Sequence, residues 1–247
     1  MQPCRGRGNR TDRFCWNQAL ITMKRITVLL AEDHPLVRVG FRALLEHERD
    51  IEVVGEAETG RQAVRLTRKL RPAVVVMDIA MPLLNGLEAT RQIRRDFPDT
   101  RVLILSAYSD DAYVEQAIGL GAAGFFLKQT SSDILATAIR EVHKGNTFFS
   151  HSIAKRLHGR HQKSPVRGGH LIKKTNRLSS REVEVLQLIA EGKPNKQVAT
   201  ELGVTFKTVD KHRQHLMAKL NIHDVSGLTR YAIAAGIIES KVRVTIR

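Results

Sequence analysis

The sequence predicts an α/β domain with a doubly wound, five-stranded parallel sheet, followed by a smaller all-α domain of four helices. Two observations predict the first domain: apolar runs of strand length alternate with stretches of helical periodicity, and this alternation continues to about residue 146. Such alternation requires crossover connections and gives a parallel sheet that helices cover on both faces. A third observation predicts the second domain, because the apolar residues after about residue 177 recur at helical spacing.

The predicted strands are short apolar runs of the first domain. Helical spacing follows the first of them, as in Leu36, Leu44 and Leu45, and a last helix is predicted from about residue 131 to residue 144. The third run is β-branched, which is typical of a strand that is buried on both faces. The five strands are expected at Ile26–Ala31, Ile51–Ala57, Ala73–Met77, Arg101–Ser106 and Gly124–Leu127.

The formal net charge of the 247-residue chain is +15, from 40 Lys and Arg against 25 Asp and Glu. Residues 24–148 contribute nothing to this excess, whereas residues 149–175 contribute +7 and residues 176–247 contribute +5. An anionic partner is therefore expected at the C-terminal end. No apolar run is long enough to span a membrane, and Cys4 and Cys15 provide no disulfide framework, so we expect a cytoplasmic protein without a membrane partner.

Three segments are predicted to lie outside the two domains. Residues 1–23 carry +3 but lack the apolar core of a signal peptide, so we expect a disordered or mis-annotated leader rather than a basic arm. Residues 147–176 have the composition of a flexible basic linker, and the histidines in it match no zinc-ligand spacing. Residues 241–247 are expected to form a tail.

Polar side chains stand at the carboxyl ends of four predicted strands, where parallel sheets bind their ligands. Glu32 and Asp33 follow the first strand, Asp78 the third and Lys128 the fifth, while Ser106 ends the fourth. This set suits phosphoryl transfer to Asp78 as the nucleophile. Mg²⁺ would relieve the repulsion among the acids, with Asp33 and Asp78 as direct ligands and Glu32 acting through water. Lys128 and Ser106 would bind the phosphoryl oxygens.

Each of these residues also has an ordinary role, such as capping a turn or facing solvent, but their convergence favours a site. A phosphatase of the dehalogenase type uses an Asp nucleophile too, and it needs a second Asp two residues later as the general acid. Ala80 occupies that position. We therefore expect a phosphoryl acceptor that loses the group by self-catalysis, and not an enzyme that turns over an outside substrate.

Residues 24–146 resemble the receiver domain of two-component response regulators. The resemblance implies a flavodoxin-like fold, phosphorylation of Asp78 by a histidine kinase, and Mg²⁺ held by Asp33, Asp78 and the main-chain carbonyl of Ala80. It also implies that Ser106 moves toward the phosphoryl group and that Tyr108 changes rotamer. Glu32 stands where Asp is commoner, and Gln129 stands where an acid is frequent. The matching motifs are Val28–Pro35, Val76–Pro82 with Asn85-Gly86, Leu105–Ala107 and Phe126–Lys128.

The helices predicted for the second domain have clear start and stop signals. Ser179-x-x-Glu182 is a capping box, Leu178 can staple the first helix, and Gly192 can stop it. A second helix is predicted at about 195–202, Gly203 makes a tight turn, and Thr205 can cap a third helix. A fourth is predicted at about 225–235. Two short helices around a glycine turn, the second one basic, are the pattern of a helix-turn-helix.

The third helix is the expected DNA-reading element, since its outward side chains can address base edges in the major groove. An ordinary solvated helix face is the alternative. RNA binding is disfavoured because residues 149–247 offer only Phe149, Phe206 and Tyr231 for stacking. The outward residues are Lys207, Thr208, Asp210, Lys211 and Gln214; the other candidates for DNA contact are Thr205 and the phosphate-binding Arg213, Lys196 and Lys193.

Residues 178–238 resemble the LuxR-type helix-turn-helix domain, which is expected at 177–240. With the receiver-like part, this gives the domain order of the NarL/FixJ class of regulators. Asp210 stands where many members have Lys, so it can help to choose bases instead of binding a phosphate. The resemblance also implies a dimer across the fourth helix, with Leu228 and Ala232 as candidate contacts. The matching runs are Leu178–Leu186, Ile189–Lys193, Asn195–Ala199, Lys207–Arg213 and Lys219-Leu220.

These observations predict a transcription factor that is switched by phosphorylation of Asp78. It would bind double-stranded DNA, form a homodimer when phosphorylated, and use Mg²⁺ as its cofactor. Two alternatives stay open. One is a constitutive DNA-binding protein whose α/β domain serves only as a docking module. The other is a phosphotransfer relay in which the basic domain is incidental.

Overall fold

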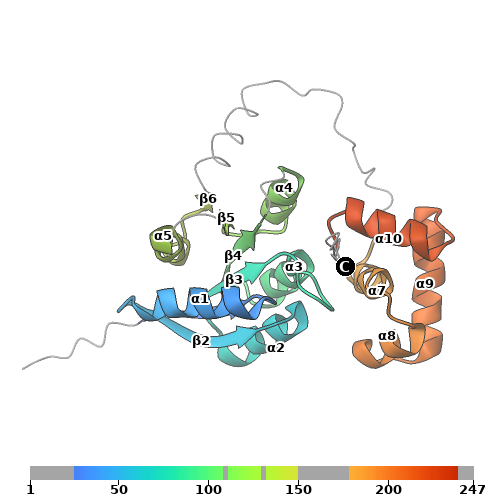
Figure 1. The fold of residues 1–247 in the computed structure, drawn as a ribbon, viewed down its shortest axis with the longest axis horizontal. Helices are drawn as coiled ribbons and strands as arrows, with labels where there is room; N and C mark the ends of the chain where they lie inside the picture. Colours follow the sequence, from blue (N-terminus) through green and yellow to red (C-terminus); the bar gives the residue numbers. More distant parts are fainter. Residues whose placement is uncertain (1–24, 108–110, 129–131, 150–177, 239–247) are drawn as a thin grey trace, which may run out of the picture.

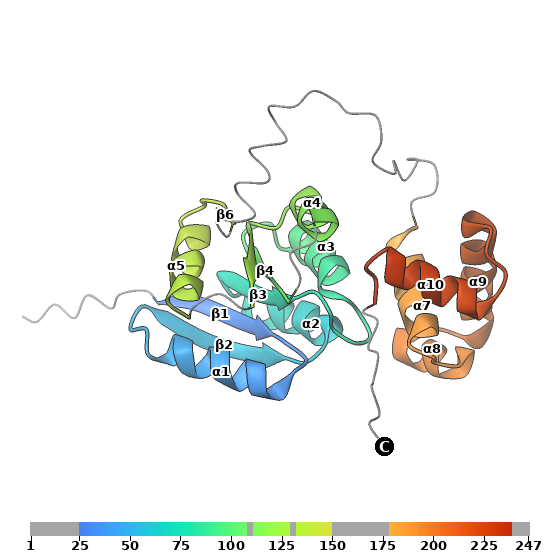
Figure 2. The same cartoon turned by 45° about the horizontal axis from the view of Figure 1, so that its top comes forward.

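The structure of the chain is a computed structural model that describes residues 25–107, 111–128, 132–149 and 178–238. An α/β domain comes first and a helical domain second, and the two are in contact (Figures 1 and 2). Within the described residues, no helix is long and apolar enough to cross a membrane. Tyr108, Gln129 and the predicted leader and tail lie outside the described residues, as does most of the predicted linker.

The sheet of the α/β domain has six strands, all paired in parallel, in the order β2-β1-β3-β4-β5-β6. The prediction of five strands was therefore wrong by one. The additional strand pairs Phe148 with Gly124 and Phe149 with Phe125, so the domain extends past the expected boundary at residue 146. The strands are β1 Ile26–Ala31, β2 Ile51–Ala57, β3 Val74–Asp78, β4 Arg101–Ser106, β5 Gly124–Leu127 and β6 Phe148–Phe149.

Helices cover both faces of this sheet because alternate residues of the inner strands point to opposite sides. Val28 and Leu30 of β1 pack in one apolar cluster with residues of α1 and α5. Leu29 and Ala31 of the same strand pack in another, with residues of α2, α3 and α4. The helices are α1 Pro35–Glu46, α2 Gly60–Leu70, α3 Gly86–Asp96, α4 Asp111–Gly119 and α5 Ser132–His143.

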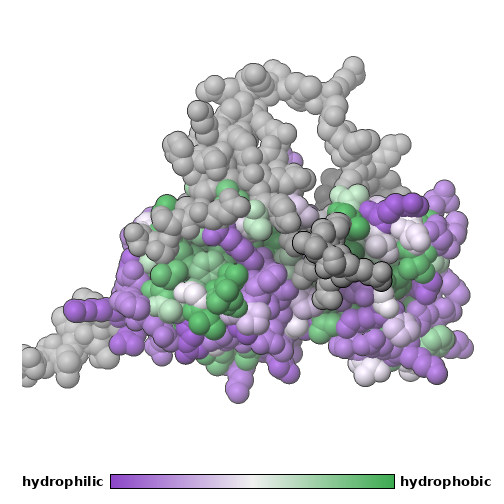
Figure 3. All heavy atoms as spheres, in the orientation of Figure 1, coloured by the Kyte–Doolittle hydropathy of each residue, from purple (hydrophilic) through white to green (hydrophobic). Residues whose placement is uncertain are grey.

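Helix α1 leaves part of its apolar surface uncovered. Leu36, Val39 and Leu44 are exposed, and Leu36 is the most exposed of the large apolar side chains described. Apolar side chains gather over this helix in the space-filling view, in which most of the surrounding surface is polar (Figure 3).

The helical domain consists, within residues 178–238, of α7 Ser180–Ala190, α8 Asn195–Leu202, α9 Phe206–Leu220 and α10 Val225–Ala234. Both hydrogen bonds of the predicted capping box are present at Ser179 and Glu182, and Lys219 of α9 pairs with Glu182 at 2.7 Å. Gly203 makes the turn between α8 and α9 with a φ of +62°, which favours glycine. All these helices contribute to one apolar cluster that includes Val185, Val198 and Val209.

Candidate functional site

The five polar groups predicted to form a site do meet at the carboxyl edge of the sheet. The strand register places Asp78 beside Leu105 and Ser106 beside Leu127, so β3, β4 and β5 end together. Glu32 and Asp33 follow the adjacent β1. Asp78 is only 2% exposed, and Glu32 and Ser106 are buried as well. The site is therefore a cluster of carboxylates around one strand end, referred to below as the acidic pocket, in which Asp78 and Glu32 are buried and Asp33 is partly buried.

Lys128 lies between two of the buried carboxylates. Its Nζ is 3.0 Å from Oδ2 of Asp78 and 2.7 Å from Oε2 of Glu32. Burial alone would lower the pKa of the Lys128 ammonium, but Asp78 and Glu32 outweigh burial and raise that pKa above its ordinary value. Lys128 therefore remains a cation at neutral pH and is fixed next to the carboxylate on which a phosphoryl group would form.

One ammonium does not neutralise this pocket. Burial, followed by the negative charge of Glu32, raises the pKa of Asp78 to about 6, although Lys128 acts in the opposite direction. Lys128 is shared between the two buried carboxylates: it donates to Oε1 of Glu32 at 3.0 Å and pairs with Oε2 of Glu32 and Oδ2 of Asp78. The ionised carboxylates therefore carry more negative charge than Lys128 neutralises, and a further cation can bind among them.

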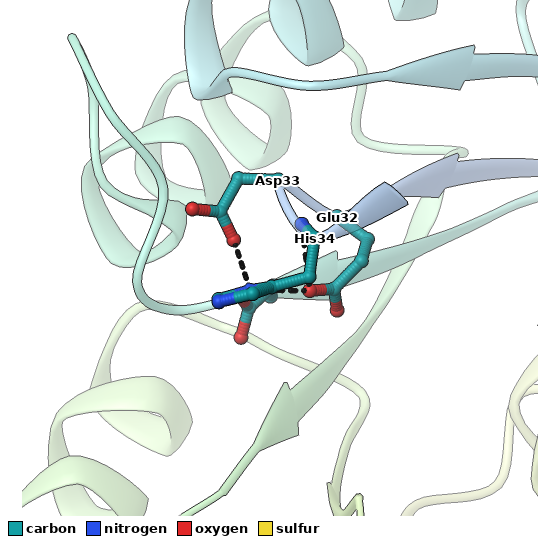
Figure 4. Close-up of side chains that lie close together, drawn as sticks. Glu32, Asp33 and His34 are labelled. Atoms are coloured by element: carbon teal, nitrogen blue, oxygen red, sulfur yellow. Dashed lines mark hydrogen bonds and ion pairs between the residues drawn. The ribbon is translucent and has the colours of Figure 1, made fainter. Parts of the chain in front are cut away.

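The donor set of the pocket fits Mg²⁺, which prefers carboxylate oxygens and retains several waters. Glu32, Asp33, His34 and Asp78 each offer a ligand atom, and these atoms lie within 4.8 Å of one another. The His34 ring lies at the carboxylates of Asp33 and Glu32, with Nδ1 at 2.7 Å from Asp33 Oδ1 and 3.2 Å from Glu32 Oε1 (Figure 4). Sequence reasoning gave His34 no role. Ala80 lies two residues beyond Asp78, in the loop after β3.

Arg38 of α1 positions the acidic turn. Its Nη1 donates to the carbonyl oxygen of Glu32 at 2.8 Å, while Nε and Nη2 bond to Glu56 and Glu58. The buried guanidinium thus fastens the turn after β1 to the end of β2. The sequence contained no sign of this, because an arginine on a helix is usually solvated.

The loop that follows Asp78 is bound to the helical domain. Gln187 of α7, which is 1% exposed, accepts from the backbone amide of Asn85 at 2.8 Å and donates to the carbonyl of Met81 at 2.9 Å. The Leu83 amide donates to Glu191, the residue that caps the end of α7, at 3.1 Å, and the Asn85 side chain donates to the carbonyl of Ile237 at 3.2 Å. The loop after Asp78 therefore docks on α7 and on the segment that follows α10.

Further contacts widen this interface between domains. Arg61 of α2 pairs with Glu184 at 3.2 Å and donates to the carbonyl of Glu201 at 2.8 Å. At Gly236, which has a φ of +67°, an added Cβ would lie 2.3 Å from the ring of Tyr113 on α4. Only glycine fits this close approach without a shift. Sequence reasoning did not identify any of these contacts.

Helix α9 lies on the side of the helical domain that is away from the α/β domain (Figures 1 and 2). Lys207, Lys211 and Gln214 are exposed on it, whereas Thr208 and Asp210 are partly buried. The Nε2 of Gln214 donates to Oδ2 of Asp210 at 3.1 Å. The outward face of α9 is thus accessible to a partner, and it carries the hydrogen-bonded pair of Gln214 and Asp210.

The other candidates for DNA contact flank α9. The hydroxyl of Thr205 caps the helix by accepting from the Thr208 amide, and Arg213 donates to the side chain of Asn195 at the start of α8. Lys196 is exposed, and Lys193 lies 3.7 Å from a carboxylate oxygen of Glu201. Lys193, Lys196 and Arg213 thus lie at or next to the start of α8, where they could contact phosphates beside α9.

The candidate dimer contacts Leu228 and Ala232 are placed differently from the expectation. Both are fully buried in the apolar cluster of their own domain, so neither is available to a second chain. The exposed large apolar residues of α10 are Val225 and Ile233, at 44% and 38% exposure. Val225 is the first residue of α10 and Ile233 lies in its last turn, so the two exposed apolar side chains stand at opposite ends of the helix.

Comparison with known proteins gives both domains a family. Residues 28–140 match the response regulator receiver domain, and residues 176–232 match the bacterial regulatory proteins of the luxR family. The transcriptional regulatory protein LiaR of Bacillus subtilis is 39% identical over 207 residues, which are 84% of this chain and 96% of LiaR. MctR of Rhizobium johnstonii, another transcriptional regulatory protein, is 38% identical over 214 residues, 87% of this chain and 96% of that protein.

Solved structures agree with this relationship. The response regulator RcsB of Salmonella typhimurium covers 85% of this chain and 99% of its own, with a TM-score of 0.52 and 29% identity. A LuxR-family two-component response regulator from Aurantimonas covers 56% of this chain with a TM-score of 0.54 and 34% identity. RcsB has also been solved as dimers bound to DNA. This chain therefore belongs to the response regulators that join a receiver domain to a LuxR-type helix-turn-helix domain and regulate transcription under the control of phosphorylation.

Proposed function

We propose that Asp78 is the phosphoacceptor and that its phosphorylation loosens the contact between the receiver and the DNA-binding domain. The observation that carries this proposal is the position of the loop Ile79–Asn85. It begins directly after the nucleophile, and it ends in backbone and side-chain hydrogen bonds to α7 and to Ile237. A change at Asp78 therefore has a short covalent path to the interface.

The chemistry assigns a task to each side chain of the pocket. A carboxylate oxygen of Asp78 attacks the phosphorus of a phosphohistidine on a partner histidine kinase, and the bond between phosphorus and nitrogen breaks as the new bond to oxygen forms. The Lys128 ammonium, 3.0 Å from Asp78, stabilises the charge on the transferred group, and Ser106 donates to it. Asp33, Asp78 and the carbonyl of Ala80 would hold Mg²⁺, with Glu32 acting through water.

Mg²⁺, when it is bound, neutralises the phosphoryl oxygens and lowers the barrier to transfer. The buried Glu32 and the partly buried Asp33 also disfavour a persistent dianionic group on Asp78, since like charges repel strongly at low local dielectric. We therefore expect water to remove the phosphoryl group in time without a second enzyme. This intrinsic loss would act as a timer for the signal.

The helical domain reads DNA through α9. Lys207, Lys211 and Gln214 supply the exposed contacts, Thr208 and Asp210 supply partly buried ones, and Lys193, Lys196, Thr205 and Arg213 contact phosphates. The dimers of RcsB on DNA support binding as a homodimer in this chain as well. Val225 and Ile233 are the exposed large apolar residues of α10 that could form that contact.

The test of the acceptor is direct. We expect incubation with acetyl phosphate and Mg²⁺ to add the mass of one phosphoryl group to the chain, and we expect Asp78→Asn to abolish the addition. Asp99→Asn, an exposed aspartate in the same domain, is the matched control and should be modified like the wild type. Modification that persists in Asp78→Asn would contradict the assignment.

A second function is favoured by one observation. Because α9 faces away from the receiver, its outward face is accessible while the domains are docked (Figure 2). The chain could therefore bind DNA without phosphorylation and use the receiver only as a docking module. Equal affinity of the phosphorylated and unphosphorylated chain for the same DNA would support this function over the switch.

A further inference from the structure

Phe206 is an aromatic residue exposed at the start of the DNA-reading helix. It is the first residue of α9, directly after the cap Thr205, and its side chain is 52% exposed. Large apolar side chains usually gain about 1.5–3 kcal/mol from burial. In the described part of the helical domain, the other exposed large apolar side chains are Val225 and Ile233 of α10, which are less exposed than Phe206 and aliphatic. Phe206 is therefore a candidate for contact with a binding partner.

The neighbours of Phe206 indicate which partner this is. Asp210 and Gln214 follow it at intervals of four residues, so the three side chains form a row along the helix. Lys207 and Lys211 are exposed beside this row, and both carry positive charge. A protein partner with an acidic rim or DNA would fit the lysines, but the paired amide and carboxylate of Gln214 and Asp210 suit base edges better than a second apolar surface.

Docking geometry places Phe206 near the bases. In a helix-turn-helix, the residues at the N-terminus of the recognition helix contact base edges in the major groove. The apolar feature of that groove is the 5-methyl group of thymine, which a phenyl ring can cover. The adenine of the same or the adjacent pair presents an amino group, which the Asp210 carboxylate can accept from.

We propose that Phe206 is a specificity-determining residue that packs against the 5-methyl group of a thymine in each half-site. This rests on α9 being the recognition helix. The lysines then hold the helix to the phosphates, whereas Phe206 and Asp210 select a thymine–adenine pair at the position nearest the helix start.

The test removes the methyl group from the DNA and the ring from the protein. Duplexes that the full chain enriches from a random pool are resynthesised with uracil in place of each thymine in turn, and affinities are measured by fluorescence anisotropy at one salt concentration. We expect at least one substitution per half-site to weaken wild-type binding about fourfold, which corresponds to the ~0.8 kcal/mol of one buried methyl-sized group. Phe206→Ala should bind the thymine and uracil duplexes equally, and Phe206→Leu should retain part of the difference.

Leu36→Ala, which removes an exposed apolar side chain from α1 of the receiver, is the control and should respond to uracil like the wild type. Unchanged binding of random DNA by Phe206→Ala would show that the helical domain is intact. The proposal is overturned if Phe206→Ala responds to every uracil as the wild type does, or if no uracil weakens wild-type binding. If Lys211→Ala and Gln214→Ala also leave sequence preference unchanged, the recognition-helix assignment fails with it.

Discussion

The substitution Gln187→Ala tests the coupling between the loop after Asp78 and the DNA-binding domain. The Gln187 amide accepts from the Asn85 backbone and donates to the Met81 carbonyl, at 2.8 and 2.9 Å, across the domain interface. A buried hydrogen bond contributes about 0.5–1.5 kcal/mol, so the docked arrangement should lose about 1–3 kcal/mol. The equilibrium between docked and undocked domains then shifts roughly 5- to 150-fold.

Hydrogen exchange at the Leu83 amide reports this shift, because Gln187 does not bond to that amide itself; Gln187 contacts only its acceptor, Glu191, at 2.8 Å. That amide donates to Glu191 across the interface, so it is protected only while the domains are docked. We expect exchange at Leu83 to accelerate by the same factor in Gln187→Ala. Gln197→Ala, an exposed glutamine on α8, should leave the rate unchanged. An unchanged rate at Leu83 in a folded Gln187→Ala protein would refute the coupling.

Three further predictions follow from the pocket and from the last helix. The pKa of Asp78 is raised to about 6, so the folded protein should lose stability as the pH rises from about 4 to about 6 without Mg²⁺. Asp78→Asn should remove this loss. By thermal unfolding, the variant should be about 3 kcal/mol more stable than the wild type near pH 7, and this gain should vanish near pH 4. A gain that is independent of pH would contradict the role of ionisation. Mg²⁺ should raise the unfolding temperature of the wild type at neutral pH and raise that of Asp33→Asn far less; equal shifts would exclude Asp33 as a ligand. Leu228→Ala should destabilise the helical domain by about 2–5 kcal/mol. Ile233→Lys should leave the stability of that domain nearly unchanged and should weaken dimers measured by sedimentation. The reverse pattern would restore Leu228 as an interface residue.

The sequence was sufficient to predict which strand-end side chains lie together, although it gave no role to His34, which contacts Glu32 and Asp33. Asp78, Ser106 and Lys128 each stand at the end of an apolar run, and parallel strands must bring such ends to one edge. The sixth strand was missed because the two residues Phe148 and Phe149 are too few to show an alternating pattern. The shortness of β6 is therefore what kept it from being predicted.

The interface between domains could not be predicted from local patterns. Gln187 is a polar residue on an amphipathic helix, and a second domain buries it. Leu83 adopts a φ of +69°, which is rare for a leucine and has no signature in the sequence. The dimer candidates were wrong for a related reason: Leu228 and Ala232 form an apolar stripe at helical spacing, and that stripe faces the core of their own domain.

The central claim is that phosphorylation of Asp78 changes DNA binding through the docked loop. The most direct measurement is the affinity of the full chain for its selected DNA before and after phosphorylation by acetyl phosphate, with Asp78→Asn treated in parallel. We predict that the phosphorylated wild type binds at least about fivefold more tightly and that Asp78→Asn does not change. Equal affinities of the two wild-type forms, with phosphorylation verified by mass, would contradict the account.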